Sequence, residues 1–145
     1  MQESRFVPKI DEYLERLKNA FDALDRTQIE DVMNVLLKAY EDEKTIYIFG
    51  NGGSASTASH YVCDFNKGIS EKKDKKFNFV CLNDNIPTML AIANDYSYEE
   101  IFKKQLVGRL KPNDLVIAIS GSGNSKNVIK AVEYAREMHI PPSSA

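Results

Sequence analysis

One arrangement occurs twice in this sequence and constrains the fold more than any other feature: a β-branched apolar run, a loop of glycine and serine, and a helix-forming segment. In the first copy the run is 45–49 and the loop is 50–54; in the second the run is 115–119 and the loop is 120–125. Short apolar runs that stop at glycine are typical of buried parallel strands. Because parallel strands need a crossover between them, usually a helix, the pattern predicts an α/β fold.

The segments between and after the two copies continue this alternation. We predict a further strand at 77–82, after a charged surface connection at 67–76. Strands that alternate with helices at this spacing predict a three-layer, doubly wound parallel sheet, which we place at residues 45–140 with a tail at 141–145. Helical periodicity predicts helices at 55–65, 86–94, 98–110 and 128–138.

The sheet is preceded by a helical segment at residues 1–44. Apolar residues recur at helical spacing from Val7 to Tyr40, which predicts two helices, and Asp25 and Thr27 supply capping chemistry for the second. Each helix has an apolar stripe that needs a cover. Helices that stand outside an α/β core often find this cover on another subunit, so we expect a homo-oligomer.

Charge and composition argue against several classes of function. Nineteen basic and twenty-one acidic residues give the 145-residue chain a net charge of −2, which argues against nucleic acid as a partner. The N-terminus is polar, unlike a signal peptide, and no run approaches the ~20 apolar residues that span a bilayer. Cys63 and Cys81 fit neither a disulfide framework nor a zinc ribbon, and we expect reduced, buried thiols. These features predict a cytoplasmic protein that does not bind membranes.

The two loops suit a phosphate group, because parallel strands bring the loops that follow them to one edge of the sheet. Glycines let backbone N–H groups approach a ligand, helix N-termini add partial positive charge, and serine hydroxyls donate hydrogen bonds. Either loop alone can equally be a tight turn with a helix cap, whereas the two together favour ligand binding. Neither has the lysine of NTP-hydrolysing phosphate loops or the GxGxxG of dinucleotide sites. The candidate hydroxyl donors are Ser54, Ser120, Ser122 and Ser125.

Two further polar pairs accompany the predicted helices. His60 and Asp64 lie four residues apart, hence on one face of the helix at 55–65, about one turn from the first loop. They can serve as a proton carrier and a base, or as a hydrogen bond that only holds the helix against its neighbours. Asn94 and Asp95 lie where the chain turns, and on the residues alone a helix C-terminal stop is the favoured interpretation.

Three blocks in the same order, GNGGSASTASHYVCDF, AIANDYSYEEIF and ISGSGNSKNVIKAVEYAR, resemble the sugar isomerase (SIS) domain, specifically the phosphoheptose isomerase family. The resemblance covers roughly residues 5 to 140. It implies a flavodoxin-like sheet and conversion of sedoheptulose 7-phosphate to a heptose 7-phosphate through an enediol. It also implies homotetramers whose sites lie between subunits.

The resemblance also implies roles for individual residues. His60 matches a position described as a zinc ligand, and Asp64 falls where the family has a glutamate that acts as catalytic base and metal contact, so zinc is the candidate cofactor. The residues that match substrate-binding positions are Asn51, Gly52 and Gly53 in the first loop, the pair Asn94 and Asp95, and Ser120, Gly121, Ser122 and Ser125 in the phosphate cradle.

Three departures from the family pattern bear on activity. Asp64 is one methylene shorter than glutamate, which displaces its carboxylate by about 1 Å and impairs proton transfer. Gly121 stands where a threonine is usual and removes one hydroxyl from the cradle. The chain ends before the family's second acid–base histidine, so we expect this chain alone to be inactive, with the edge and one face of the strand at 115–119 uncovered.

Two functions remain open at this point. The first is a sugar-phosphate isomerase, with Asp64 as base and His60 as its partner in proton transfer. The second is a non-catalytic SIS protein that binds sugar phosphates as a regulator or adaptor, because a fold alone does not fix the chemistry.

Overall fold

The computed structural model describes residues 5–138 and 142–144. The chain divides into two compact units, residues 1–33 and 34–145, and the boundary lies within the second helix. None of the described helices combines the length and apolar character needed to cross a bilayer. In chain order the elements are helix α1 (Val7–Asp22), helix α2 (Arg26–Glu41), strand β1 (Thr45–Gly50), helix α3 (Gly53–Cys63), π-helix η1 (Asp64–Ile69), strand β2 (Asn78–Cys81), helix α4 (Ile86–Asp95), 3₁₀-helix η2 (Tyr98–Glu100), helix α5 (Lys103–Leu106), strand β3 (Leu115–Ile119), helix α6 (Lys126–Glu137) and strand β4 (Pro142–Ser144).

The first unit contains α1 and the beginning of α2, as the periodicity predicts. Pro8 lies in the first turn of α1, where its missing N–H removes no helical hydrogen bond. The Asp25 carboxylate accepts hydrogen bonds from the backbone N–H groups of Thr27 and Gln28 at 2.9 and 3.3 Å, which confirms the capping predicted for Asp25, whereas Thr27 takes part only through its backbone N–H. No residue of α1 is buried, so its apolar stripe has no cover within this unit.

The second unit is built on a parallel sheet with the strand order β2-β1-β3-β4. Ile48 in β1 pairs with Cys81 on one side and with Ile117 on the other. The predicted doubly wound α/β fold is confirmed. The expectation of an uncovered edge is wrong, because residues 142–144 pair with β3 as a short parallel strand. The expectation of an uncovered face on β3 is also wrong, since Leu115, Val116 and Ile117 are all buried.

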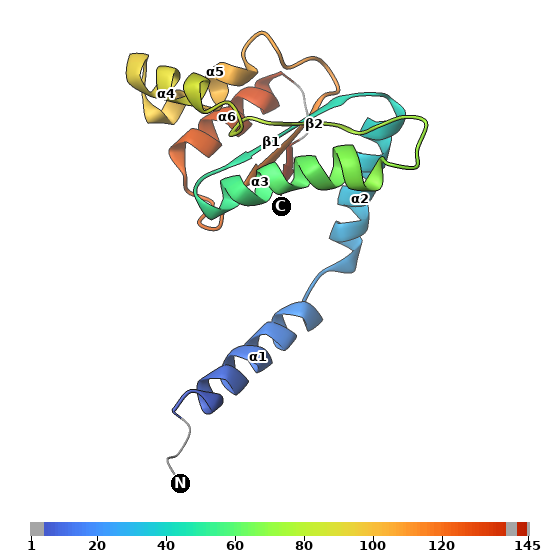
Figure 1. The fold of residues 1–145 in the computed structure, drawn as a ribbon, viewed down its shortest axis with the longest axis vertical. Helices are drawn as coiled ribbons and strands as arrows, with labels where there is room; N and C mark the ends of the chain where they lie inside the picture. Colours follow the sequence, from blue (N-terminus) through green and yellow to red (C-terminus); the bar gives the residue numbers. More distant parts are fainter. Residues whose placement is uncertain (1–4, 139–141, 145) are drawn as a thin grey trace. The chain divides into compact units, whose positions relative to one another are not determined.

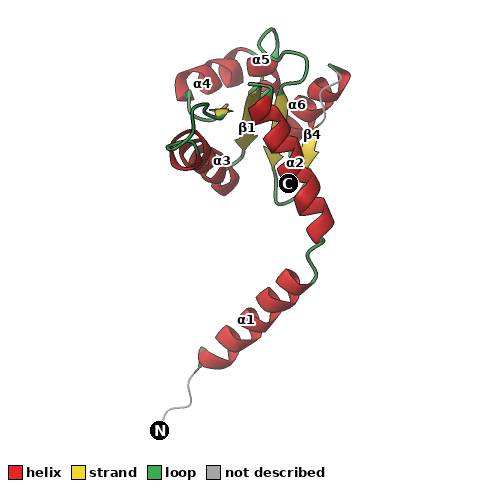
Figure 2. Cartoon of the chain, turned by 90° about the vertical axis from the view of Figure 1, so that its right-hand side faces the viewer, coloured by secondary structure: helices red, strands yellow, loops and turns green. Residues whose placement is uncertain are grey.

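Helices cover both faces of the sheet and make three layers, as Figure 1 shows for α3 on one side and α4 to α6 on the other. Alternate side chains of each strand point to opposite faces, so β1 contributes to two separate cores. One core joins Tyr47 and Phe49 to residues of α5 and α6, and Phe49 stacks on Phe102 with ring centroids 4.7 Å apart. The other joins Ile46 and Ile48 to residues of α2 and α3. Figure 2 shows β1 enclosed among these helices.

Three local features differ from the sequence prediction. The segment 98–110 is not one helix: η2 and α5 are short, and the chain turns at Gly108, whose φ is +75°. A left-handed residue ends a helix at little cost when it is glycine. The helix predicted at 55–65 begins at Gly53 and widens into the π-helix η1 at Asp64. Cys81 is buried as expected, but Cys63 is exposed.

Candidate functional site

The two glycine and serine loops follow the two central strands of the sheet. From β1 the chain crosses to β2 on one side and then returns to β3 on the other, so the strand order changes direction between β1 and β3. Ligands of open α/β sheets bind outside the carboxyl ends of the strands at such a switch point. The loops at 50–54 and 120–125 both start there, as their place in the sequence predicts.

Gly50 brings the first loop into close contact with the end of β3. A Cβ atom at Gly50 would lie 2.7 Å from the carbonyl oxygen of Ile119 and 2.6 Å from the Cβ of Ser54, so no other residue fits without movement. The N–H of Gly50 donates to Oδ1 of Asn83 at 3.1 Å, and Nδ2 of Asn83 donates back to the Gly50 carbonyl at 2.9 Å. The ends of β1, β2 and β3 are thereby fixed to one another.

A reciprocal pair of amides links the first loop to the helix that follows the second. Nδ2 of Asn51 donates to Oδ1 of Asn127 at 2.9 Å, and Nδ2 of Asn127 donates to Oδ1 of Asn51 at 2.8 Å. The N–H of Val128 also donates to Oδ1 of Asn127, which fixes the orientation of that amide. The hydroxyl of Tyr98 donates to Oδ1 of Asn51 at 3.0 Å. We call Asn51, Tyr98 and Asn127 the amide clamp.

The clamp limits what Asn51 can do for a ligand. Its Oδ1 has two acceptor sites, and the Asn127 and Tyr98 bonds use both. One hydrogen of Nδ2 stays available to a ligand. Asn51 is therefore first a residue that positions the loop, and only a single donor to anything bound beside it.

The second loop is closed by its own atoms and is exposed. Oγ of Ser120 accepts the N–H of Gly123 at 3.1 Å, and Oγ of Ser122 accepts the N–H of Asn124 at 3.2 Å. Gly123 has a φ of +65°, which favours glycine at this turn. Because each hydroxyl acts as an acceptor in these bonds, its hydrogen remains available to donate to an anion.

Two helix N-termini complete the site. Gly52 (φ +54°) and Ser125 occupy the N-cap positions of α3 and α6, and neither caps its helix with a side-chain hydrogen bond. In α3 the N–H groups of Ser54 and Ala55 donate to the carbonyls of Asn51 and Gly52, and in α6 the N–H of Val128 donates to Asn127. The first N–H of each helix remains for an anion, and the helix dipole adds partial positive charge there. The helix-cap alternative thus fails for the side chain of Ser125. Ser54, half-buried in the first turn of α3, lies beside Gly50.

His60 and Asp64 face each other on α3 and at its junction with η1. His60 Nε2 lies 3.5 Å from Asp64 Oδ2, and the two side chains are 74% and 57% exposed. His60 is seven residues beyond the start of α3 at Gly53, about 10 Å along the helix, which is two turns and not the single turn expected. The pair is therefore accessible to a ligand but stands apart from the loop of its own chain.

The same pair offers two ligands to a metal ion. In the part of the chain that the structure describes, no group of three His, Cys, Asp or Glu residues gathers at any point. A catalytic zinc ion takes three protein ligands. The described residues of this chain alone do not form a zinc site.

Asn94 and Asp95 interact with each other at the end of α4. Nδ2 of Asn94 donates to Oδ1 of Asp95 at 3.0 Å, and both residues are exposed. The chain leaves the helix at Tyr96, and Tyr98 then reaches Asn51. The pair lies at a helix end, where the sequence placed it, and precedes the segment that carries one member of the clamp.

The residues that fix the loops were not among the candidates from sequence. Asn83, Tyr98 and Asn127 act on the loops through side chains whose partners lie 33 to 76 residues away. No local sequence pattern marks Asn127: it is 3% exposed in the first turn of α6, and a buried amide needs a partner, but its burial is known only from the fold. Ion pairs of Lys126 and Lys130 with Glu99, and of Lys130 with Glu100, hold η2 against α6 and so support Tyr98.

Comparison with known proteins agrees with this architecture. The profile of the SIS domain family matches residues 8–141. A probable phosphoheptose isomerase of Thermoplasma volcanium is 36% identical over 129 residues, which are 89% of this chain and 65% of that protein. A phosphoheptose isomerase of Helicobacter pylori is 38% identical over 126 residues, 87% of this chain and 65% of the relative. The chain thus spans about 65% of the length of these relatives.

Solved structures show the same fold. The phosphoheptose isomerase GmhA of Neisseria gonorrhoeae superposes with a TM-score of 0.82 at 27% identity, covering 98% of this chain and 73% of that one. A phosphoheptose isomerase of Francisella tularensis gives a TM-score of 0.86 at 22% identity, and the match covers 96% of this chain and 74% of that one. The fold, the two loops at the switch point and the family profile agree, and the chain belongs to the SIS domain family together with these phosphoheptose isomerases.

Proposed function

We propose that this chain provides the phosphate-binding part of an isomerase that interconverts the ketose sedoheptulose 7-phosphate and its aldose through an enediol. The observation that carries the proposal is the meeting of two donor-rich loops at one switch point, held there by Gly50 and the amide clamp. The names of the relatives at 36% and 38% identity support the choice of substrate.

The second loop is the part that binds the phosphate. Hydroxyls of Ser120, Ser122 and Ser125 donate to phosphate oxygens, and the N–H of Gly121 and the first turn of α6 add backbone donors. No lysine or arginine takes part. Gly121, where a threonine is usual, supplies its N–H but no hydroxyl.

Proton transfer falls to His60 and Asp64. The Asp64 carboxylate removes the proton from the carbon next to the carbonyl and later returns it to the neighbouring carbon. His60 carries a proton from the hydroxyl oxygen to the former carbonyl oxygen, so that the enediol forms and collapses without net gain or loss of protons. The 3.5 Å separation lets Asp64 orient the His60 ring between these steps.

The partner of this chain is a second copy of itself. His60 and Asp64 lie about 10 and 16 Å along the helix from the first loop, which favours a site that takes the phosphate loops from one chain and this pair from another. Both are exposed and open to another subunit. The uncovered apolar stripe of α1 is consistent with such an assembly.

The test is turnover of sedoheptulose 7-phosphate, followed by NMR of the anomeric protons, with this chain and with any longer form of it that the gene encodes. Asp64→Asn should abolish turnover and leave binding unchanged, whereas Asp64→Glu should raise the rate of turnover. Glu71→Gln, which neutralises an exposed carboxylate further along the same segment, is the matched control and should change neither.

A mixing experiment tests the shared site. Asp64→Asn and the double variant Ser120→Ala with Ser122→Ala should each be inactive. Refolding the two together should restore part of the activity, because one site of the mixed oligomer then combines the intact serines of the first variant with the intact Asp64 of the second. Failure to restore any activity, with mixed oligomers demonstrated, would contradict the shared site. Binding without turnover by every form, including Asp64→Glu, would instead favour the sugar-phosphate regulator.

A further inference from the structure

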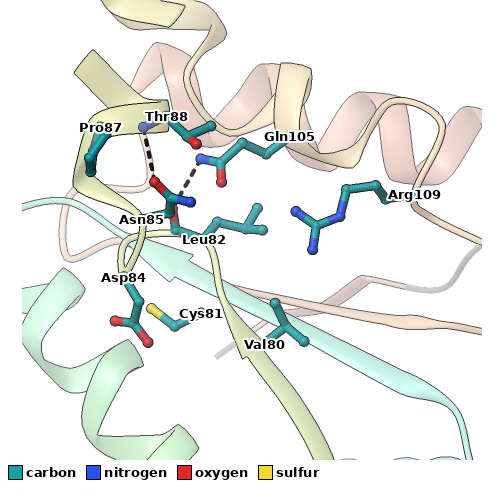
Figure 3. Close-up of a pocket in the computed structure, with 9 residues that line it drawn as sticks. All are labelled: Val80, Cys81, Leu82, Asp84, Asn85, Pro87, Thr88, Gln105 and Arg109. Carbon is teal, nitrogen blue, oxygen red and sulfur yellow. Dashed lines mark hydrogen bonds between the residues drawn. The ribbon is translucent and has the colours of Figure 1, made fainter. Parts of the chain in front are cut away.

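A cavity of about 380 Å³ lies beside β2, between that strand and the segments of α4 and α5 (Figure 3). None of its lining residues belongs to either glycine and serine loop. Its volume falls within the range of small-molecule sites. Val80, Leu82 and Pro87 give it apolar walls, and Thr88, Gln105 and Arg109 bring polar groups to it.

Gln105 presents a buried acceptor to this cavity. The residue is 6% exposed, and its Nε2 donates to the carbonyl oxygens of Leu82 at 3.0 Å and Ile101 at 2.9 Å. These two bonds use both amide hydrogens and fix which way the amide faces. Oε1 then has no donor among the described residues, although buried polar atoms in proteins are nearly always paired. A donor from a ligand would satisfy it.

Arg109 presents a cation to the same cavity. The N–H of Arg109 donates to the Leu106 carbonyl at 3.0 Å, and its own carbonyl accepts the Tyr47 hydroxyl at 3.3 Å, so the backbone at this point is anchored. The guanidinium extends towards Gln105 and Leu82 in Figure 3. It forms no ion pair with any acidic group in the described ranges, 5–138 and 142–144. An anion is the ligand group that a guanidinium recognises best.

The remaining polar groups define the other end of the cavity. Asp84 lies opposite Arg109 in Figure 3, and its Oδ1 accepts the hydroxyl of Ser59 at 2.6 Å. Oδ1 of Asn85 accepts the N–H of Thr88 at 3.0 Å, which leaves the Asn85 amide hydrogens and the Thr88 hydroxyl for a ligand. An acidic end and a basic end disfavour a ligand that is anionic throughout.

Two other occupants are disfavoured. An added β-strand needs free main-chain groups on the outer edge of β2, but Asn66 pairs with both the N–H and the carbonyl of Phe79, and the N–H of Asp84 donates to the Cys81 carbonyl. Covalent attachment at Cys81 is disfavoured because burial raises the pKa of its thiol to about 11, which keeps it protonated near neutral pH.

We propose that this cavity is a second binding site, for a small molecule with one terminal anionic group and several hydroxyls, such as a phosphorylated polyol. The anionic group pairs with Arg109, one hydroxyl donates to Oε1 of Gln105, and the carbon chain lies on Val80 and Leu82. Further hydroxyls reach Thr88 and Asp84. The site is independent of the function proposed for the loops.

The test is a two-dimensional amide NMR titration of the full chain with three probes: glucose 6-phosphate, glucose and sulfate. Glucose 6-phosphate should shift the side-chain amide signals of Gln105 and the backbone signals of Thr88 and Arg109. Glucose has the hydroxyls without the anionic group, and sulfate has the anionic group without the hydroxyls. Each should therefore bind at least tenfold more weakly at these residues. Equal binding of sulfate alone would overturn the role of Gln105, and no shift with any probe would overturn the site.

Variants separate Arg109 from general surface charge. Arg109→Met should weaken glucose 6-phosphate binding at Gln105 about tenfold or more, as expected when a charge-assisted hydrogen bond is lost, while shifts at Ser122 in the second loop persist. Arg109→Lys should restore part of the affinity. Arg136→Met, which removes an exposed arginine from α6, is the matched control and should have no effect. An unchanged affinity in Arg109→Met, or an equal loss in Arg136→Met, would overturn the proposal.

Discussion

The two glycine and serine loops look alike in sequence but are held in different ways. The first is fixed by distant side chains: Asn83 brackets Gly50, and Asn127 and Tyr98 hold Asn51. The second is closed by bonds within itself, from backbone N–H groups to its own serine hydroxyls, and it stays exposed. The first loop therefore organises the edge of the sheet, whereas the second keeps hydroxyl hydrogens for the phosphate that we propose it binds. The same sequence pattern can thus be held in two different ways.

The largest expected effect of a single change is at Gly50. Gly50→Ala places a methyl group 2.7 Å from the Ile119 carbonyl oxygen, which is backbone and cannot move freely. We expect a loss of about 3 kcal/mol in the free energy of unfolding, the upper range for an overpacked site, measured by urea denaturation. Gly121→Ala in the second loop meets no atom within 4 Å and should cost less than about 0.5 kcal/mol. Similar losses at both positions would remove the distinction between the loops.

The amide clamp gives the next effect. Asn127→Ala removes both bonds to Asn51 and the bond to the N–H of Val128, and it should cost about 1 to 3 kcal/mol of stability. A double-mutant cycle with Asn51→Ala should give a coupling energy above about 0.5 kcal/mol. Asn124→Ala, an exposed asparagine of the second loop, serves as the comparison and should be near neutral. Strict additivity in the Asn51 and Asn127 cycle would contradict a clamp.

Ser122 should show the reverse behaviour. Ser122→Ala removes an exposed hydroxyl that bonds only within its loop, so stability should change by less than about 0.5 kcal/mol. Affinity for a sugar phosphate should fall about tenfold, because a hydrogen bond to a charged oxygen is lost. Calorimetric titration measures this, and Ser56→Ala, on the exposed side of α3, is the control with no expected change. An unaltered affinity in Ser122→Ala would move the phosphate away from this loop.

The ion pairs that support Tyr98 should give the smallest effect. Hydrogen bonds from Lys130 lower the pKa of Glu99 and Glu100 below their usual value of 4.5. Because the folded-state pKa is the lower one, the stabilisation is complete above the unfolded-state value and is lost as the pH falls through the folded-state value. Lys130→Met should therefore reduce the loss of stability on acidification below about pH 4.5, and high salt should erase the difference, since these groups are on the surface. Identical acid unfolding of the two proteins would exclude this support.

Strands were more predictable from this sequence than the contacts that hold the loops. The strand at 115–119 matches its prediction because a β-branched run between a turn and a glycine loop has few other structures open to it. The single helix at 98–110 was wrong because periodicity reports neither the break between η2 and α5 nor the left-handed turn at Gly108 that follows α5. The uncovered edge of β3 was wrong because a strand of three residues, with proline at its start, carries almost no sequence signal.

The candidate site was predictable in its loops but not in its supports. Serine, glycine and strand ends are local features, and the convergence of the loops follows from parallel pairing alone. Asn127 and Gln105 are different, because their roles depend on burial and on partners far along the chain. A sequence shows that an amide is present, but only the fold shows which of its atoms lack a partner. The spacing of His60 and Asp64 correctly predicted that they share one face of the helix. Their distance from the loop was not predictable, because it depends on where the helix begins, which is Gly53.

Amide NMR mapping with sedoheptulose 7-phosphate tests the central claim most directly, since the backbone N–H of each residue in the two loops gives its own signal. The account predicts the largest shifts at the backbone N–H groups of Gly121, Ser122 and Ser125, with small shifts at Gly50 and Asn51, whose groups are already bonded. Shifts confined to the first loop, or to the cavity beside β2, with the second loop unmoved, would contradict it.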